Sequence, residues 1–145
     1  MEKDLETEED TLKAKLEALE KLKSSNNEID VSSTLLDIVL IYIKHEKNDK
    51  AFKYFNQFFE MKKLPKENSI EKAHRSIAGV FKKEGKSDEA LKYYNQLLEI
   101  KKQIMPSNPD QIAKTLSSIA LVYHDQRNYE ETLKYYNQTL EMEKQ

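Results

Sequence analysis

The sequence contains no cysteine and no tryptophan, and only two glycines and three prolines among its 145 residues. Without cysteine, disulfides, thiolate nucleophiles, zinc ribbons and iron–sulfur ligation are all excluded. So few glycines and prolines leave little material for hairpins, phosphate-binding loops or many short strands. Hydrophobic residues still make up 38% of the chain, and thirteen Tyr and Phe residues argue against wholesale disorder. Together these features predict an all-α fold.

The sequence also has no long apolar run and no targeting segment. Its longest uninterrupted apolar run covers residues 38–43, which is much too short for a membrane span. The first ten residues, MEKDLETEED, are acidic and polar, unlike a signal peptide or an Arg-rich transit peptide. We therefore expect a soluble, cytoplasmic protein with no membrane partner.

Charge is divided unevenly along the chain, although the formal net charge is only −2. Residues 1–28 carry nine acids and five bases, net −4, whereas residues 44–102 carry fifteen bases and nine acids, net +6. Such asymmetry biases the choice of partners. The pI of about 6.0 and the presence of only two arginines are unlike the basic footprint of a nucleic-acid-binding domain. We expect no nucleic-acid partner.

The histidines and glycines form no catalytic or metal-binding pattern. His45, His74 and His124 belong to no HExxH arrangement, and none has a second histidine four residues away. We expect His45 at a helix end, and the other two on the surface or in a groove. With only Gly79 and Gly85, the GxSxG, Walker and dinucleotide fingerprints are excluded. The chain is therefore predicted not to be an enzyme, and to bind no metal and no cofactor.

One eight-residue pattern occurs three times in the chain. It reads KAFKYFNQ at 50–57, EALKYYNQ at 89–96 and ETLKYYNQ at 131–138, with offsets of 39 and 42 residues. Before each copy, apolar residues recur at i, i+1, i+3 and i+4, which is one face of a helix, and a short polar break follows. Self-similarity at this period is typical of stacked helix–turn–helix repeats.

Two further positions identify the kind of repeat. An aromatic residue occupies the same place in each first helix: Tyr42, Phe81 and Tyr123. A small residue opens each second helix: Ala51, Ala90 and Thr132. These positions resemble the tetratricopeptide repeat, and the stretch MPSNPD at 105–110 resembles the longer loop of the 42-residue kinesin-light-chain-type repeats. The resemblance implies a right-handed α-α superhelix of about seven antiparallel helices, with repeats at 29–66, 67–106 and 107–145.

The acidic segment 1–28 is expected to add a helix of its own. Leu12, Leu16, Leu19 and Leu22 recur at helical spacing within it. We interpret this helix as a capping or half-repeat helix that packs on the first repeat, because terminal repeats need an atypical polar cover. Alternatively, the acidic residues 2–10 dock on the basic surface of the chain itself as a weak pseudo-ligand.

The resemblance also places a partner-binding groove on the first helix of each repeat. Carried over by register, its residues are Leu36, Leu40, Ile43, Lys72, Arg75, Lys82, Lys83, Lys114, Leu121 and His124. This groove would be apolar at its N-terminal end and basic in its middle, which suits an acidic peptide with one large apolar side chain. We therefore predict a non-catalytic adaptor or scaffold. The alternatives are that the three apolar residues 36, 40 and 43 belong to the core, and that the basic residues form an ordinary solvated face.

The last helix suggests a second function. Leu133, Tyr136 and Leu140 would leave an apolar edge uncovered if no further helix follows them. Two copies of the chain could then stack through this edge as a homodimer, which would make the chain a structural assembly module. The sequence equally fits a fragment of a longer repeat array.

Overall fold

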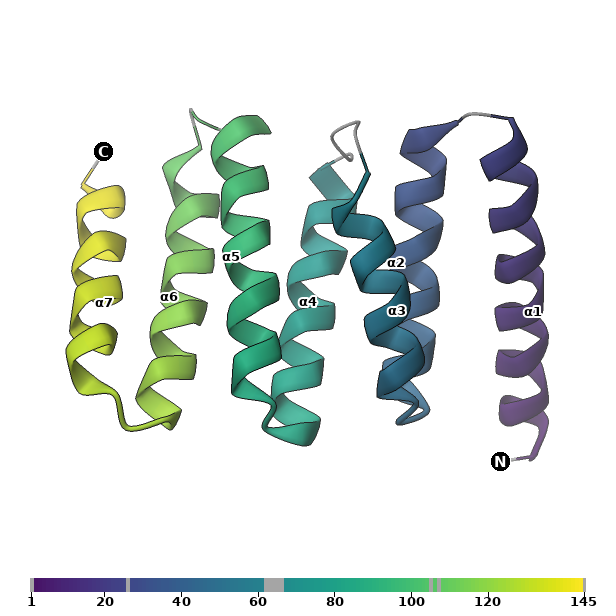
Figure 1. The fold of residues 1–145 in the computed structure, drawn as a ribbon, viewed down its shortest axis with the longest axis horizontal. Coiled ribbons are helices and arrows are strands. Elements are labelled where there is room, and N and C mark those ends of the chain that lie inside the picture. Colours follow the sequence, from purple (N-terminus) through teal and green to yellow (C-terminus); the bar gives the residue numbers. More distant parts are fainter. Residues whose placement is uncertain (1, 26, 62–66, 105, 107, 145) are drawn as a thin grey trace. The chain divides into compact units, whose positions relative to one another are not determined.

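The computed structural model describes residues 2–25, 27–61, 67–104, 106 and 108–144, with side chains for all of these except 2–6, 67 and 68. These residues form seven helices and no strand (Figure 1). The helices are α1 (Glu2–Ser24), α2 (Glu28–Lys44), α3 (Asn48–Phe59), α4 (Glu67–Glu84), α5 (Ser87–Ile104), α6 (Pro109–Asp125) and α7 (Tyr129–Glu143). The prediction of an all-α chain of about seven antiparallel helices is confirmed.

The chain divides into two compact units, residues 1–76 and 77–145, and the boundary falls within α4. In the first unit α1 packs against α2, and α2 packs against α3. The core of this unit includes the fully buried side chains of Leu35, Ile38 and Phe55. Leu19 of α1 is buried, and α1 packs against α2.

The second unit contains the remainder of α4 together with α5, α6 and α7. Here α5 packs against α6, and α6 packs against α7. Its core includes the fully buried side chains of Ile77, Leu97 and Ile119. Tyr123 and Tyr135 stack with ring centroids 5.6 Å apart, and Tyr42 and Tyr54 stack in the same way at 5.8 Å in the first unit. The repeated sequence pattern therefore produces the same helix-to-helix contact twice.

Asparagine side chains fix the start of three helices. The side chain of Asn27 accepts a hydrogen bond from the backbone N–H of Asp30 at the start of α2. Asn108 does the same at the start of α6, and Asn128 does so at the start of α7. Such caps satisfy one of the backbone N–H groups that the first turn of a helix leaves unpaired. The helix starts are therefore set by local sequence rather than by distant contacts.

The turn between the two helices of each hairpin contains one residue in the left-handed conformation. Glu46, Gly85 and Arg127 occupy equivalent positions and adopt φ of 62°, 60° and 62°. This left-handed conformation costs roughly 1–2 kcal/mol for a residue with a Cβ, whereas glycine adopts it freely. Lys47 and Asn128 then donate their backbone N–H groups to the carbonyls of Tyr42 and Tyr123 at 2.9 Å. These bonds close the helix ends and hold the strained residues in place.

We expect glycine to be the most stable residue at all three turn positions. Glu46→Gly and Arg127→Gly should each raise the free energy of unfolding by about 0.5–1 kcal/mol, because they relieve left-handed strain. Gly85→Ala should lower it by a similar amount through the backbone alone, since an added Cβ would meet no atom within 4 Å. Urea denaturation followed by circular dichroism measures all three. Equal stability of Gly85→Ala and the parent chain would contradict this account of the turn.

Candidate functional site

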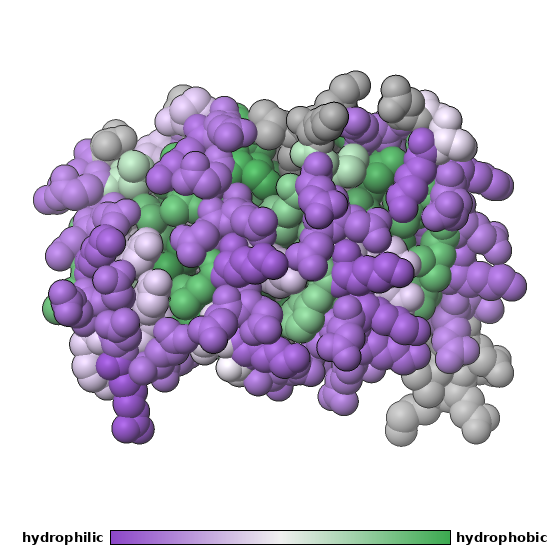
Figure 2. All heavy atoms as spheres, viewed as in Figure 1, coloured by the Kyte–Doolittle hydropathy of each residue, from purple (hydrophilic) through white to green (hydrophobic). Residues whose placement is uncertain are grey.

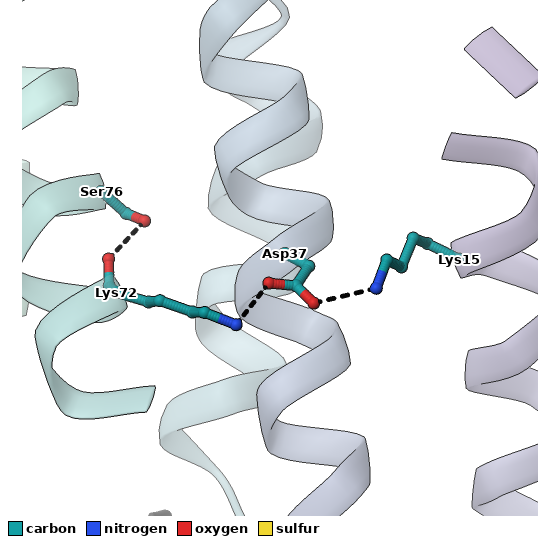
Figure 3. A network of polar contacts seen from close by, with 4 residues as sticks. All are labelled: Lys15, Asp37, Lys72 and Ser76. Carbon is teal, nitrogen blue, oxygen red and sulfur yellow. Dashed lines mark hydrogen bonds and ion pairs between the residues drawn. The ribbon is translucent and has the colours of Figure 1, made fainter. Parts of the chain in front are cut away.

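A carboxylate between two lysines is the central polar feature of the first unit (Figure 3). Lys72 donates a hydrogen bond to Oδ1 of Asp37 at 2.8 Å, and Lys15 donates one to Oδ2 at 3.1 Å. The side chains of Asp37 and Lys72 are only 23% and 25% exposed. On the next turn of α4, Ser76 donates its hydroxyl to the Lys72 carbonyl at 2.8 Å. Asp37 thus joins α1, α2 and α4 within this unit.

The surroundings of Asp37 favour its charged form. Burial by itself raises the pKa of this carboxyl, but the hydrogen bonds from Lys72 and Lys15 and the charges of these two lysines outweigh it. The net result is a pKa below the ordinary value of 3.8. Lys72, expected to present its charge to a partner, is therefore already paired with a carboxylate of the chain itself.

A second set of ion pairs lies near the start of α1. Glu8 accepts a hydrogen bond from Lys44, and its other carboxylate oxygen lies 2.7 Å from Nε2 of His45. The hydrogen bond from Lys44 is the largest cause of the lowered pKa of Glu8; partial burial opposes it, and the charges of Lys44 and His45 add to it. One acidic residue of the segment 2–10 thus contacts basic groups of α2. The side chains of residues 2–6 lie outside the described residues.

The apolar residues expected in the groove of the first repeat differ in their exposure. Leu36 and Ile43 are buried in the core of the first unit, while Leu40 is half-buried. The core alternative therefore describes Leu36 and Ile43, which offer no surface to a ligand. His74, expected on the surface or in a groove, is also buried. Arg75 is exposed on α4.

In the second unit, the expected groove residues lie at the surface. Lys82 and Lys83 are exposed in the last turn of α4, and Lys114, Leu121 and His124 are exposed on α6. Leu121 is 50% exposed. The spacing 114, 121, 124 places these three side chains on one face of the helix. An exposed leucine on α6 is therefore flanked along the helix by a lysine and a histidine.

The exposed face of α7 is apolar. Leu133, Tyr136 and Leu140 are 63%, 38% and 54% exposed. Tyr129, which sequence reasoning placed in a polar break, extends this stripe at 57% exposure. The four residues follow one another at intervals of four, three and four, and this spacing could have revealed Tyr129 as a member of the stripe. We call these four residues the α7 stripe. In α5, the counterparts of Tyr136 and Leu140 are Tyr94 and Leu98, and both are buried.

On the face shown in Figure 2, hydrophilic residues predominate and hydrophobic residues are visible between them. Within the described residues, no group of three or more His, Cys, Asp or Glu side chains is arranged to hold a metal ion. The same part of the chain has no helix with the length and apolar character needed to cross a membrane.

Comparison with known families agrees with the helical hairpins. Models of the tetratricopeptide repeat match residues 73–104 and 113–145. This chain carries tetratricopeptide repeats. The matched segments contain the hairpins α4–α5 and α6–α7 without the first part of each leading helix. Tetratricopeptide repeats indicate a protein–protein interaction module.

A solved structure shares the tetratricopeptide-repeat fold of the chain. The crystal structure of BtubC (BKLC) from P. vanneervenii superposes with a TM-score of 0.68 at 17% sequence identity. The match covers 95% of this chain and 56% of that protein, so the chain spans about half the length of this neighbour. No curated protein matches the chain in sequence. At this identity the likeness is one of fold.

The Asp37 network should contribute to stability in a pH-dependent way. Asp37→Asn keeps the shape of the side chain but removes its charge, and should lower the free energy of unfolding at pH 7 by about 1 kcal/mol. Because the pKa is lowered in the folded state, this contribution is present above pH 3.8 and is lost as the pH falls below it. Urea denaturation at pH 7 and near pH 3 should show the two proteins converge in acid. Asp125→Asn, an exposed site, is the control and should change stability little. A difference between Asp37→Asn and the parent chain that is independent of pH would contradict this assignment.

Proposed function

We propose that the chain is a non-catalytic adaptor that binds a peptide segment of a partner protein on the first helices of its repeats. The preferred segment is acidic and carries one large apolar side chain. The observation that carries this proposal is the exposed face of α6, where Leu121 lies between Lys114 and His124 along the helix. A single exposed leucine is common on protein surfaces. A leucine beside basic side chains can anchor an apolar side chain of a peptide and also favour a peptide with acidic flanks.

The basic residues would act mainly on the rate and selectivity of binding. Lys82, Lys83 and Lys114 belong to the second unit, and all three are exposed. Such charges steer an acidic segment toward the surface and discriminate against basic ones, while the apolar contact supplies most of the affinity. Because the helices hold these side chains on rigid elements, little conformational entropy of the receptor is lost on binding.

The internal ion pairs favour the second unit as the binding region. Lys72 is paired with Asp37, and Lys44 is paired with Glu8, so both cations already have carboxylate partners. An acidic peptide would have to compete with these carboxylates for either lysine. We therefore do not assign the peptide contact to these two lysines or to the buried apolar positions 36 and 43 of the first repeat, and we assign it to the exposed side chains of Lys82, Lys114, Leu121 and His124.

Fluorescence anisotropy with three labelled peptides tests this proposal. The peptides share one central leucine and differ in having acidic, neutral or basic flanks. We expect the acidic peptide to bind most tightly, and Lys82→Glu/Lys114→Glu to weaken it about tenfold, with Leu121→Ala having a similar effect. Lys13→Glu, an exposed substitution on α1, is the matched charge control. Equal binding of all three peptides, or no effect of either groove variant, would refute the proposal.

A second candidate function is assembly through the α7 stripe. Four large apolar side chains exposed on one helix form a contiguous patch of the kind that usually marks an interface. Their four-three-four spacing is that of a coiled-coil seam, so the same face on a second copy is complementary to it in an antiparallel arrangement. Within residues 7–24 of α1, the exposed residues, such as Lys13, Glu17 and Lys21, offer no comparable apolar face. This favours a closed pair of α7 helices over head-to-tail stacking.

Sedimentation equilibrium tests the assembly function. The parent chain should form a dimer at micromolar concentration that persists in high salt, because apolar contacts are not screened. Leu133→Lys/Leu140→Lys should be monomeric, whereas Leu121→Lys, which alters an exposed leucine outside the stripe, should remain dimeric. A parent chain that is monomeric at every concentration would eliminate this function and leave peptide binding unaffected.

A further inference from the structure

Each unit contains an open pocket where three helix ends meet. In the first unit, a pocket of about 330 Å³ lies among the end of α1, the start of α2 and the end of α3. In the second unit, a pocket of about 280 Å³ is lined by the ends of α5 and α7 and by the first half of α6. Neither pocket includes Lys82, Lys114, Leu121 or His124, the residues of the proposed peptide contact.

The two pockets are built from equivalent residues. Five residues of α2 and the end of α3 that line the first pocket have counterparts 81 positions later that line the second pocket. The matched pairs are Val31 and Ile112, Leu35 and Leu116, Gln57 and Gln138, Glu60 and Glu141, and Met61 and Met142. A lysine of the preceding helix also lines each pocket, Lys23 in the first and Lys102 in the second. The remaining lining residues have no counterpart: Leu22, Asn27 and Glu28 in the first pocket and Asn137 in the second. The repeat therefore forms the same pocket twice.

Residues on the rim are repeated although they are not needed for the core. The pairs Asn56-Gln57, Asn95-Gln96 and Asn137-Gln138 are identical in the three repeats, as are Glu60, Glu99 and Glu141. The asparagine and the glutamate are exposed in every case. Substitutions at exposed positions usually change stability by less than about 0.5 kcal/mol, so packing does not require these side chains. Their recurrence points to a role at the surface.

The floor of each pocket is apolar, and its rim carries both glutamate and lysine side chains. Val31, Leu35 and Met61 line the first, and the flexible thioether of methionine adapts to differently shaped apolar groups. Two helices end at each pocket and one begins there, so the exposed carbonyl groups add negative partial charge to that of Glu60 or Glu141.

The lysines that line the two pockets, Lys23 and Lys102, contact other side chains of the chain. Lys23 donates a hydrogen bond to Oε1 of Gln57 at 3.3 Å and lies 4.0 Å from Glu20. Lys102 lies 3.9 Å from Glu99. These contacts partly compensate the charge of each lysine. Glu141 is paired as well, because it accepts a hydrogen bond from Lys144 at 3.3 Å, but the two side chains are 72% and 73% exposed and such surface pairs are weak. An incoming cation therefore competes with Lys144 for Glu141 in the second pocket.

From this arrangement we propose that each pocket binds a lysine or arginine side chain from a basic peptide of a protein partner. The aliphatic stem lies on the apolar floor, and the cationic head reaches Glu60 in the first pocket or Glu141 in the second. Lysine and arginine are the side chains that combine a long apolar stem with a positive head. This site goes beyond the proposed function, because it lies at the hairpin ends and selects the opposite charge.

Methyl NMR of the two methionines provides a test with an internal control. The chain is labelled at the methionine methyl groups, and the signals are assigned with Met61→Leu and Met142→Leu. A peptide with the sequence Gly-Arg-Leu-Arg-Gly is added, and the isosteric peptide with citrulline in place of arginine measures the contribution of charge. We expect the arginine peptide to shift both methyl signals, with an affinity at least fivefold above that of the citrulline peptide.

Two charge-neutralising variants complete the test. Glu60→Gln should abolish the shift of Met61 and preserve that of Met142, while Glu141→Gln should do the reverse. Each unaltered pocket thus reports that the protein remains folded. Unmoved methyl signals, equal binding of the citrulline peptide, or retention of the Met61 shift in Glu60→Gln would overturn the proposal. None of these results tests the binding of an acidic peptide to α6, so either proposal can be refuted without refuting the other.

Discussion

Each helical hairpin of this chain buries its apolar residues only by packing against neighbouring helices, and this need for mutual cover determines where function can reside. Side chains such as Phe55 and Leu97 have no exposed fraction because adjacent helices enclose them. A helix face that no other described helix covers is either polar or apolar and exposed. In the first unit the exposed side chains of α1 include the charged residues Lys13 and Glu17. In the second unit the exposed side chains of α7 include the apolar residues Leu133 and Leu140.

Charge is used in two distinct ways on this scaffold. Within the first unit, Asp37 and Glu8 occupy cations that the repeat pattern would otherwise present to a partner. These pairs join α1 and α4 to α2, so they contribute to packing. In the second unit, Lys82 and Lys83 of α4 and Lys114 and Leu121 of α6 are all exposed. The same class of side chain is thus structural in one unit and is proposed to select a partner in the other.

Much of the fold follows from the sequence because each repeat encodes its own helices. The recurring KYYNQ-type segments and the aromatic residues Tyr42 and Tyr123 predict the hairpins without any tertiary information. Assigning groove residues by their position in the repeat predicted the site less well, because this method treats every repeat alike. Leu36 and Arg75 hold the same repeat position, yet the first is buried and the second is exposed. Exposure depends on which helix lies beside a position, and a single repeat does not contain that information.

The contacts that sequence reasoning missed involve residues far apart in the chain. The pairing of Asp37 with Lys15 and Lys72 brings together three helices, and no local spacing reports it. The left-handed turns at Glu46 and Arg127 also have no signal in residue type, because only Gly85 is the expected glycine. The pockets at the hairpin ends did have a signal. Glutamine, glutamate and methionine recur at matching places in the first and third repeats, and none of these six side chains is fully buried.

The most direct test of the central claim is an amide NMR titration of the intact chain with the acidic, leucine-centred peptide. If α6 is the peptide-binding face, the largest chemical-shift changes will fall between Lys114 and His124, with Leu121 among them. They will decrease as salt is added, because the charge contribution is screened. An α6 that is unaffected at saturating peptide, or changes confined to the helix ends around Met61 and Met142, would contradict the assignment of peptide binding to this face.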